Sequence, residues 1–284
     1  MPEKVSVVIP WRAQCGESPY WDSSRRSIMW VDIVGRQVLT SAIDDTTRAI
    51  DYPEMVGAVA PCAEGGLVLA VESGFAILDV AGTVTDRIDV LRPPNRMNDA
   101  KVDPAGRYWA GSCAMDFQVG RGGLWRLDRN LDARLVLDGL TQPNGIGWSP
   151  DGTAMYLVET QARELLRFDF DPEESEIVGG PRVIAHGFGG YPDGLAVDAD
   201  GNIWLAEFAG RAVHQFDPSG TILRSVEIPT AQPTSCAFVG EDLDRLWVTS
   251  AAAGLSIEDD PHAGSVFEIG GHGTRGCPVA LFKG

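Results

Sequence analysis

One sequence repeat, a glycine-containing turn followed by an apolar strand, recurs along this chain and limits the folds it can adopt more than any other feature. In its fullest copy the turn is Asp198-Ala-Asp-Gly201 and the strand runs from Ile203 to Phe208. Leu195 and Val197 alternate with small residues before the turn, so the two halves predict a β-hairpin. A further strand, Ala212 to Phe216, follows. One unit therefore contains three to four short strands.

Five other segments resemble this repeat, and each has a large apolar residue at the same point of its second strand. The equivalent residues are Trp30, Leu69, Trp109, Tyr156, Trp204 and Trp247, at steps of 39, 40, 47, 48 and 43 residues. Units of this length and make-up predict an all-β fold, a six-bladed β-propeller with four-stranded antiparallel blades. A continuous ring of blades predicts a single domain over residues 1–284.

The two ends of the chain are predicted to close the ring. Val5 to Ile9 reads as a strand, and in a propeller an N-terminal strand can complete the last blade, which removes the open sheet edge. We expect Val279 to Phe282 to lie close to that strand. The order of strands in the closing blade stays open at this point.

The charge balance and the apolar runs argue against two classes of partner. The 284 residues include 23 Lys and Arg against 40 Asp and Glu, a formal net charge of −17. Nucleic acid is bound through clustered cations, so a nucleic-acid partner is not expected. No window reaches the roughly 18 apolar residues of a membrane span, and the N-terminus lacks a signal-peptide pattern. We expect a cytoplasmic protein without a membrane partner, as a monomer or weak homo-oligomer.

Motifs of several enzyme classes are missing from the sequence. The five cysteines are scattered without a CxxC pair, which predicts buried free thiols. The four histidines show no HxxxH or HExxH spacing, although His186 lies shortly before Tyr191. There is no Gly-x-Ser-x-Gly elbow, P-loop or dinucleotide fingerprint. The usual cues for serine hydrolases, NTPases and dinucleotide enzymes are therefore absent.

The phase of the repeat selects one residue per unit as a candidate for the channel. Counting back 11 to 13 positions from each reference residue reaches the residue just before the predicted innermost strand. These residues are Glu17, Gly57, Asn98, Asn144, Asp193 and Ser235. Because equivalent positions of a propeller lie at the same height around its axis, we expect all six at one mouth of the channel.

Three of these six residues form a set suited to a metal ion. Two carboxylates that point into one cavity repel each other unless a cation or a proton lies between them. Glu17, Asn144 and Asp193 together offer hard oxygen ligands for Ca²⁺, Mg²⁺ or Mn²⁺. Asn-Gly and Asp-Gly are also common turn dipeptides. The shared phase across blades favours the metal site over separate turns, so a central metal site is predicted.

Longer motifs identify a family resemblance. The chain resembles the regucalcin, gluconolactonase and luciferin-regenerating-enzyme family over nearly its whole length. The motifs that carry this resemblance are Gly16-Glu-Ser-Pro-Tyr-Trp-Asp22, Arg96-Met-Asn-Asp-Ala-Lys-Val-Asp103, Pro143-Asn-Gly-Ile-Gly-Trp148, Tyr191-Pro-Asp-Gly194 and Leu246-Trp-Val-Thr-Ser250. The resemblance implies a six-bladed propeller with one divalent cation held by Glu17, Asn144 and Asp193. It also implies that Arg96 and Asn98 hold a sugar.

Two positions depart from the family pattern. Ala100 stands where many members have glycine, which is a small change. Asp116 stands where animal members have a glutamate that contacts substrate, so the sugar preference is open. Asp116 belongs to a glycine-containing loop, Met115 to Gly123, which is expected to overhang a pocket.

The resulting hypothesis is a metal-dependent, gluconolactonase-like hydrolase that opens a sugar (aldono-)lactone to the aldonic acid. The cation polarises the carbonyl, Asp193 orients or deprotonates the attacking water, and Arg96 and Asn98 bind the substrate. Asp99 and Asp116 are further candidate sugar contacts. Calcium is the favoured ion, with Mg²⁺, Mn²⁺, Zn²⁺ and Fe²⁺ as alternatives. The expected partner is a small-molecule sugar lactone.

Two alternative functions share the same cation. One is a non-enzymatic calcium-binding or regulatory protein, for which an arginine placed to hold a sugar would serve no purpose. The other is a propeller esterase or organophosphate hydrolase, which a more apolar pocket lid would favour. The loop from Met115 to Gly123 mixes polar and apolar residues and does not separate these alternatives.

Overall fold

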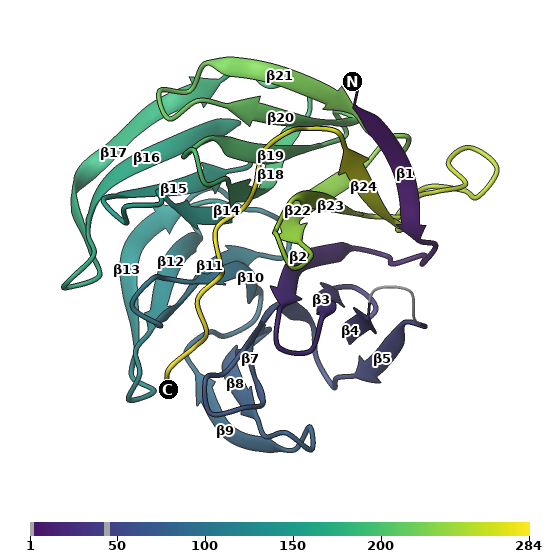
Figure 1. Ribbon diagram of the computed structural model, residues 1–284. Coiled ribbons are helices and arrows are strands. Elements are labelled where there is room, and N and C mark those ends of the chain that lie inside the picture. The colour runs from purple at the N-terminus through teal and green to yellow at the C-terminus, as the bar shows by residue number, and fades with distance from the viewer. Residues whose placement is uncertain (1–2, 43–45) are drawn as a thin grey trace.

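The computed structural model describes residues 3–42 and 46–284 and has the predicted architecture. Within these residues the strands form six four-stranded antiparallel sheets arranged in a ring around a common axis (Figure 1). The first strand of each sheet contacts the first strands of both neighbouring sheets, which closes an inner ring. The all-β, six-bladed propeller with four-stranded antiparallel blades is therefore confirmed.

The first three blades each take four consecutive strands. Blade one contains β2 (Gly16–Asp22), β3 (Ser27–Asp32), β4 (Gln37–Ala42) and β5 (Arg48–Asp51). Blade two contains β6 (Val56–Pro61), β7 (Leu67–Val71), β8 (Gly74–Leu78) and β9 (Val84–Asp89). Blade three contains β10 (Asn95–Val102), β11 (Tyr108–Ala114), β12 (Gly122–Leu127) and β13 (Ala133–Leu140).

The last three blades complete the ring, and the sixth borrows a strand from the N-terminus. Blade four contains β14 (Pro143–Trp148), β15 (Ala154–Glu159), β16 (Glu164–Asp171) and β17 (Glu176–His186). Blade five contains β18 (Tyr191–Val197), β19 (Ile203–Phe208), β20 (Ala212–Phe216) and β21 (Ile222–Glu227). Blade six contains β22 (Pro233–Val239), β23 (Arg245–Ser250), β24 (Val266–Gly270) and β1 (Lys4–Ile9).

Burial falls from the inside of each blade to its outside. Every residue of β2 and β6 is buried, whereas every residue of β5 is exposed. The six reference residues of the repeat all lie on the second strands and are at most 3% exposed. They pack between neighbouring sheets, so the repeat marks the residues through which adjacent blades contact each other.

A buried aspartate explains why the sequence repeat combines a turn with a tryptophan. Asp198 Oδ1 accepts hydrogen bonds from the backbone nitrogens of Asp200 and Asn202 in the turn, and its Oδ2 accepts one from Trp204 Nε1 at 3.0 Å. Asp103 repeats this geometry, because its Oδ2 accepts from Trp109 Nε1 at 2.8 Å. One carboxylate therefore fixes both the turn and the second strand.

Ring closure agrees with the sequence in one respect and differs in another. The N-terminal strand β1 does complete the last blade, where it pairs with β24. The prediction that Val279 to Phe282 lie beside it is wrong. The C-terminal segment crosses the channel instead (Figure 1), and Phe282 is fully buried, pairing with Cys62 of blade two and contacting Tyr108. Burial of this aromatic ring draws the segment away from the closing blade.

The two ends of the channel differ in which ends of the inner strands they contain. The near mouth is the end where β2, β6, β10, β14, β18 and β22 begin, and the far mouth is the end where they finish. The C-terminal segment lies across the far mouth, because its residues 277–280 lie beside the last residues of these strands.

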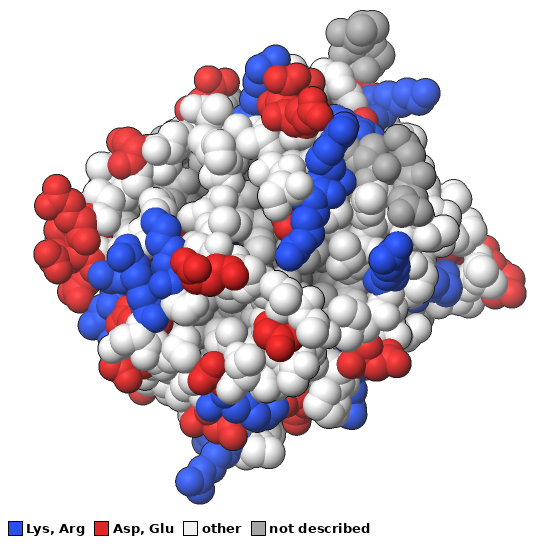
Figure 2. Space-filling view, turned by 60° about the horizontal axis from the view of Figure 1, so that its bottom comes forward, with Lys and Arg blue, Asp and Glu red and all other residues white. Residues whose placement is uncertain are grey.

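The surface and the cysteines fit the composition. Acidic and basic side chains are interspersed over the face drawn in Figure 2. All five cysteines are free, and Cys62, Cys113 and Cys236 are buried. Among the described residues, no helix has the length and apolar character needed to span a bilayer.

Candidate functional site

Each inner strand carries an irregularity at the position that the repeat selected. The register of pairing shifts between Glu17 and Tyr20, Val56 and Ala58, Met97 and Ala100, Pro143 and Ile146, Pro192 and Leu195, and Pro233 and Ser235. The six selected residues therefore lie within the inner strands, in or beside a bulge, and not just before those strands as predicted. Bulges re-aim side chains, and here they lie where the strands enter the channel.

Glu17, Asn144 and Asp193 come together at the near mouth, as expected. All three are at most 6% exposed. Asn144 Nδ2 donates a short hydrogen bond to Asp193 Oδ1, and the carboxyl groups of Asp193 and Glu17 lie close enough for each to shift the pKa of the other. Three blades thus supply three oxygen-bearing side chains to one point.

The two carboxyl groups of this site resist ionising together. Burial raises the pKa of Glu17 well above its ordinary value, and the neighbouring charges of Asp193 and Asp99 raise it further. Burial likewise raises the pKa of Asp193, with Asp99 as the next cause. Burial and the nearby acids therefore disfavour a second negative charge at this point, which a cation would offset.

Thr160 determines which way the Asn144 amide faces. Its hydroxyl donates to the carbonyl oxygen of Pro192 at 2.8 Å and therefore has only lone pairs left for Asn144. Asn144 Nδ2 donates to that hydroxyl at 3.2 Å. The amide oxygen is left facing the other way, buried and without a hydrogen-bond partner. The Asn144 nitrogen therefore lies against Thr160 and Asp193, and its amide oxygen points away from both.

This donor set fits a hard divalent cation. It offers two buried carboxyl groups and one unpartnered amide oxygen, which are oxygen ligands of the kind that a hard dication binds. Residues 3–42 and 46–284 contain no group of three or more His, Cys, Asp or Glu side chains that could hold a metal. The site differs from such groups because its third donor is an asparagine.

Arg96 and Asn98 lie on the bulged strand β10 next to these three residues. Arg96 Nη1 donates to Asn98 Oδ1 at 2.8 Å and to the carbonyl oxygen of Met97. Asn98 Nδ2 donates to the carbonyl oxygen of Pro143, beside Asn144. The Arg96 charge also lowers the pKa of Asp193 against the effect of burial. The predicted substrate-binding pair is therefore held in place and close to the acidic centre.

The other two predicted sugar contacts are not brought together. Asp99 is buried and lines a cavity of about 10 Å³ inside the channel with Ser18 and Lys101. Asp116 is exposed on a loop at the near mouth. The structure thus separates an acid within the channel from an acid at the rim.

The near-mouth loop is shorter than predicted, because β12 begins at Gly122 and leaves residues 115–121 outside the sheet. Met115 and Val119 are exposed apolar residues on this loop. Its ends are fixed: the Met115 nitrogen donates to the Pro94 carbonyl oxygen, and Asn95 Nδ2 donates to the Arg121 carbonyl oxygen. The loop begins beside Arg96, whose strand neighbour is Cys113.

Sequence reasoning missed Thr160 and left the histidines open. Thr160 follows β15, and the antiparallel pairing of Pro143 with Glu159 places it opposite Gln142, two residues before Asn144. That register was the one signal that could have found it. His186 is exposed at the end of β17, and His214 hydrogen-bonds to Glu207 and Ser225 in blade five.

Comparison with known proteins gives consistent matches. The description "SMP-30/Gluconolactonase/LRE-like region" matches residues 15–252. Regucalcin of Danio rerio is 34% identical over 291 residues, covering 99% of each chain. The 6-deoxy-6-sulfogluconolactonase of Pseudomonas putida is 32% identical over 295 residues, covering all of both chains. The crystal structure of a calcium-binding protein, regucalcin, from Agrobacterium tumefaciens superposes with a TM-score of 0.93 at 29% identity, covering 97% of this chain and 96% of the other.

Proposed function

The chain belongs to the SMP-30/gluconolactonase/LRE-like family, and from this premise we propose that it is a divalent-metal-dependent lactonase that opens a sugar (aldono-)lactone to the aldonic acid. Lactonases within the family support hydrolase activity, among them the similar sulfogluconolactonase. The observation that carries the proposal is the meeting of Glu17, Asn144 and Asp193 next to the fixed pair of Arg96 and Asn98.

Glu17, Asn144 and Asp193 are the proposed ligands. When bound there, a divalent cation supplies Lewis acidity to the lactone carbonyl and stabilises negative charge on its oxygen. The amide oxygen of Asn144 is already free of other partners. Calcium is the proposed resident ion, because oxygen-only ligand sets suit hard cations and the similar Agrobacterium protein is described as calcium-binding.

The remaining residues orient the reactants. Arg96 holds the lactone through its oxygens, while Asn98 accepts a hydrogen bond from Arg96 Nη1 and fixes the arginine. Asp193 orients the attacking water and accepts its proton. Water adds to the carbonyl carbon, the bond from that carbon to the ring oxygen breaks, and the ring oxygen takes up a proton. Asp116 at the rim and Asp99 in the channel are proposed as secondary sugar contacts.

A second candidate function is cation binding without turnover. The similarity to regucalcin favours it, since the Agrobacterium relative is described as a calcium-binding protein. The same three ligands would serve, but the positioned Arg96 would have no role. Turnover is therefore the property that separates the two candidates.

The test is lactone hydrolysis by chelator-stripped protein, followed by proton release with a panel of aldonolactones. Ca²⁺, Mg²⁺, Mn²⁺, Zn²⁺ or Fe²⁺ is added back one at a time, and binding of each ion is measured in parallel. Turnover that a bound cation restores supports the lactonase and ranks the ions and sugars. A cation that binds with no turnover across the panel would favour the calcium-binding alternative.

A further inference from the structure

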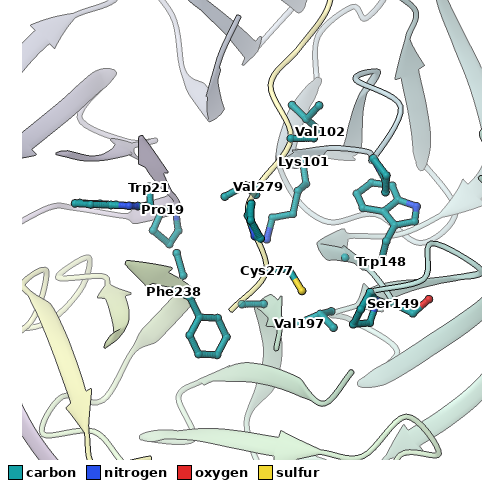
Figure 3. A pocket seen from close by; sticks show the side chains of 17 residues that line it. Pro19, Trp21, Lys101, Val102, Trp148, Ser149, Val197, Phe238, Cys277 and Val279 are labelled. Atoms are coloured by element: carbon teal, nitrogen blue, oxygen red, sulfur yellow. The ribbon is translucent and has the colours of Figure 1, made fainter. Parts of the chain in front are cut away.

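The far mouth of the channel contains a second pocket, of about 360 Å³, that the proposed lactonase site does not use. It is lined by the last residues of five inner strands and by residues 277–280 of the C-terminal segment (Figure 3). Its volume lies in the range of small-molecule pockets. The cavity of about 10 Å³ inside the channel has room for about one water. A sugar at the near mouth therefore does not extend into the far-mouth pocket.

The walls of this pocket are apolar and aromatic, with one charge at the centre. Figure 3 shows the Lys101 side chain extending between Trp21, Trp148 and Phe238, with Cys277 beside it. Lys101 is the single charged residue among the 17 described residues that line the pocket. A small molecule in this space would contact aromatic side chains over its body and an ammonium group at one point.

The Lys101 ammonium keeps capacity for a ligand. Its Nζ donates to the carbonyl oxygen of Leu195 at 2.8 Å, which uses one of its three protons. No salt bridge to Lys101 is present in the described part of the chain. Two N–H groups therefore have no hydrogen-bond partner within the described residues, although the Lys101 charge also acts on Asp99, whose pKa it lowers across the small channel cavity.

The charge of the ligand follows from this single cation. A phosphate or a dicarboxylate is usually held by several cations or by a row of backbone N–H groups. One ammonium in a protein of net charge −17 balances one negative charge. The apolar walls select an uncharged, aromatic-sized body for the rest of the molecule.

We propose that the far-mouth pocket binds a small monocarboxylate with an aromatic or similarly bulky apolar body, whose carboxylate contacts Lys101 Nζ. The C-terminal segment forms one wall and is fixed on both sides of the pocket. The Gly276 nitrogen donates to Leu243 O at 2.8 Å, and the Phe282 nitrogen donates to Pro61 O at 3.0 Å. This site is independent of the proposed lactonase chemistry.

The experiment titrates chelator-stripped, full-length protein with 4-fluorophenylacetate and, separately, with neutral 4-fluorophenylacetamide, using ¹⁹F NMR. The acid is expected to bind about tenfold more tightly than the amide, because a hydrogen bond to a charged group contributes about that factor. Lys101→Met should remove the preference for the acid, and Lys101→Arg should keep it. Cys277→Phe, which fills the pocket but keeps the lysine, should abolish binding of both compounds.

Two further measurements locate the bound molecule. Asp193→Asn, at the near mouth, should leave the affinity unchanged, which excludes binding at the cation site. In wild-type protein the acid should slow alkylation of Cys277 by iodoacetamide, as followed by mass spectrometry, and should not slow that of Cys15. Equal binding of acid and amide, unchanged binding in Cys277→Phe, or unprotected Cys277 at saturating acid would each overturn the proposal.

Discussion

Asp193 lies near the start of β18 and Asp198 directly follows its last residue, and both are buried, yet the groups around them differ. Asp198 accepts hydrogen bonds from Asn202, Trp204 Nε1 and Gln215 Nε2, so its charge is met by donors. Asp193 lies beside the carboxyl groups of Glu17 and Asp99, and burial followed by the Asp99 charge raises its pKa and disfavours its ionised form. A buried carboxylate surrounded by donors stabilises a fold, whereas one beside other acids is a candidate for binding or catalysis.

The largest expected effect is that of Asp193→Asn on turnover. The amide keeps the size of the side chain but removes its charge and its basicity, so cation-supported kcat should fall about 10³-fold. Metal-free protein should not lose stability, because the change removes one of two repelling carboxyl groups. Steady-state kinetics and urea unfolding measure the two quantities. Retained turnover would remove Asp193 from the site, and a large loss of metal-free stability would make it a structural residue like Asp198.

Asp198→Ala should have the opposite profile. It leaves the buried donors of Trp204 and Gln215 without partners, which should lower the free energy of unfolding by about 3 kcal/mol. Urea unfolding measures this loss. The kcat of the folded fraction should stay within about twofold of wild type, since the residue lies beyond the far end of β18. A stability change near zero would show that the repeated Asp–Trp bond does not hold the blade together.

Thr160→Val tests whether one hydroxyl sets the asparagine orientation at the near mouth. Valine has the same shape but cannot accept from Asn144 Nδ2, which keeps only Asp193 as an acceptor, so the amide is held less firmly in its orientation. Cation affinity, measured by calorimetry, should fall about tenfold, the size of one hydrogen-bond contribution. Thr160→Ser restores the hydroxyl and should restore affinity. Equal affinities in all three proteins would mean that the amide orientation has another cause.

The fold was predictable because its signal is periodic. A turn and a buried aromatic residue recur at nearly constant steps, and the phase of that repeat placed Glu17, Asn144 and Asp193 at one height before any contact was known. Their meeting through hydrogen bonds agrees with this phase. Their role as ligands stays a prediction.

Features that depend on side-chain contacts across blades were not predictable. The contact of Thr160 with Asn144 depends on strand register, which a bulge shifts at this very point. The path of the C-terminal segment is set by the burial of Phe282 against Tyr108, more than 170 positions away in the sequence. The different depths of Asp99 and Asp116 likewise follow from strand and loop geometry that composition does not encode.

The smallest effect is expected at Asp169, an exposed carboxylate that can be compared with the buried Asp193 and Asp198. Asp169 pairs with Arg182 on the outer strands β16 and β17, and both side chains are more than half exposed. Water already solvates both charges, and the pair must hold two long side chains in one arrangement. Asp169→Asn should therefore change the free energy of unfolding by no more than about 0.5 kcal/mol, measured by urea unfolding.

The same variant should leave both cation affinity and turnover at wild-type values, because the outer strands of blade four are remote from the near mouth. A loss of more than about 1 kcal/mol in the free energy of unfolding would mean that an ion-pair partner determines how much a carboxylate stabilises the fold even when both side chains are exposed to water. That result would weaken the distinction between Asp193 and Asp198, which assumes that burial magnifies the influence of neighbouring groups. An unchanged free energy of unfolding in Asp169→Asn would mean that the difference between Asp193 and Asp198 depends on burial and on the neighbouring groups together.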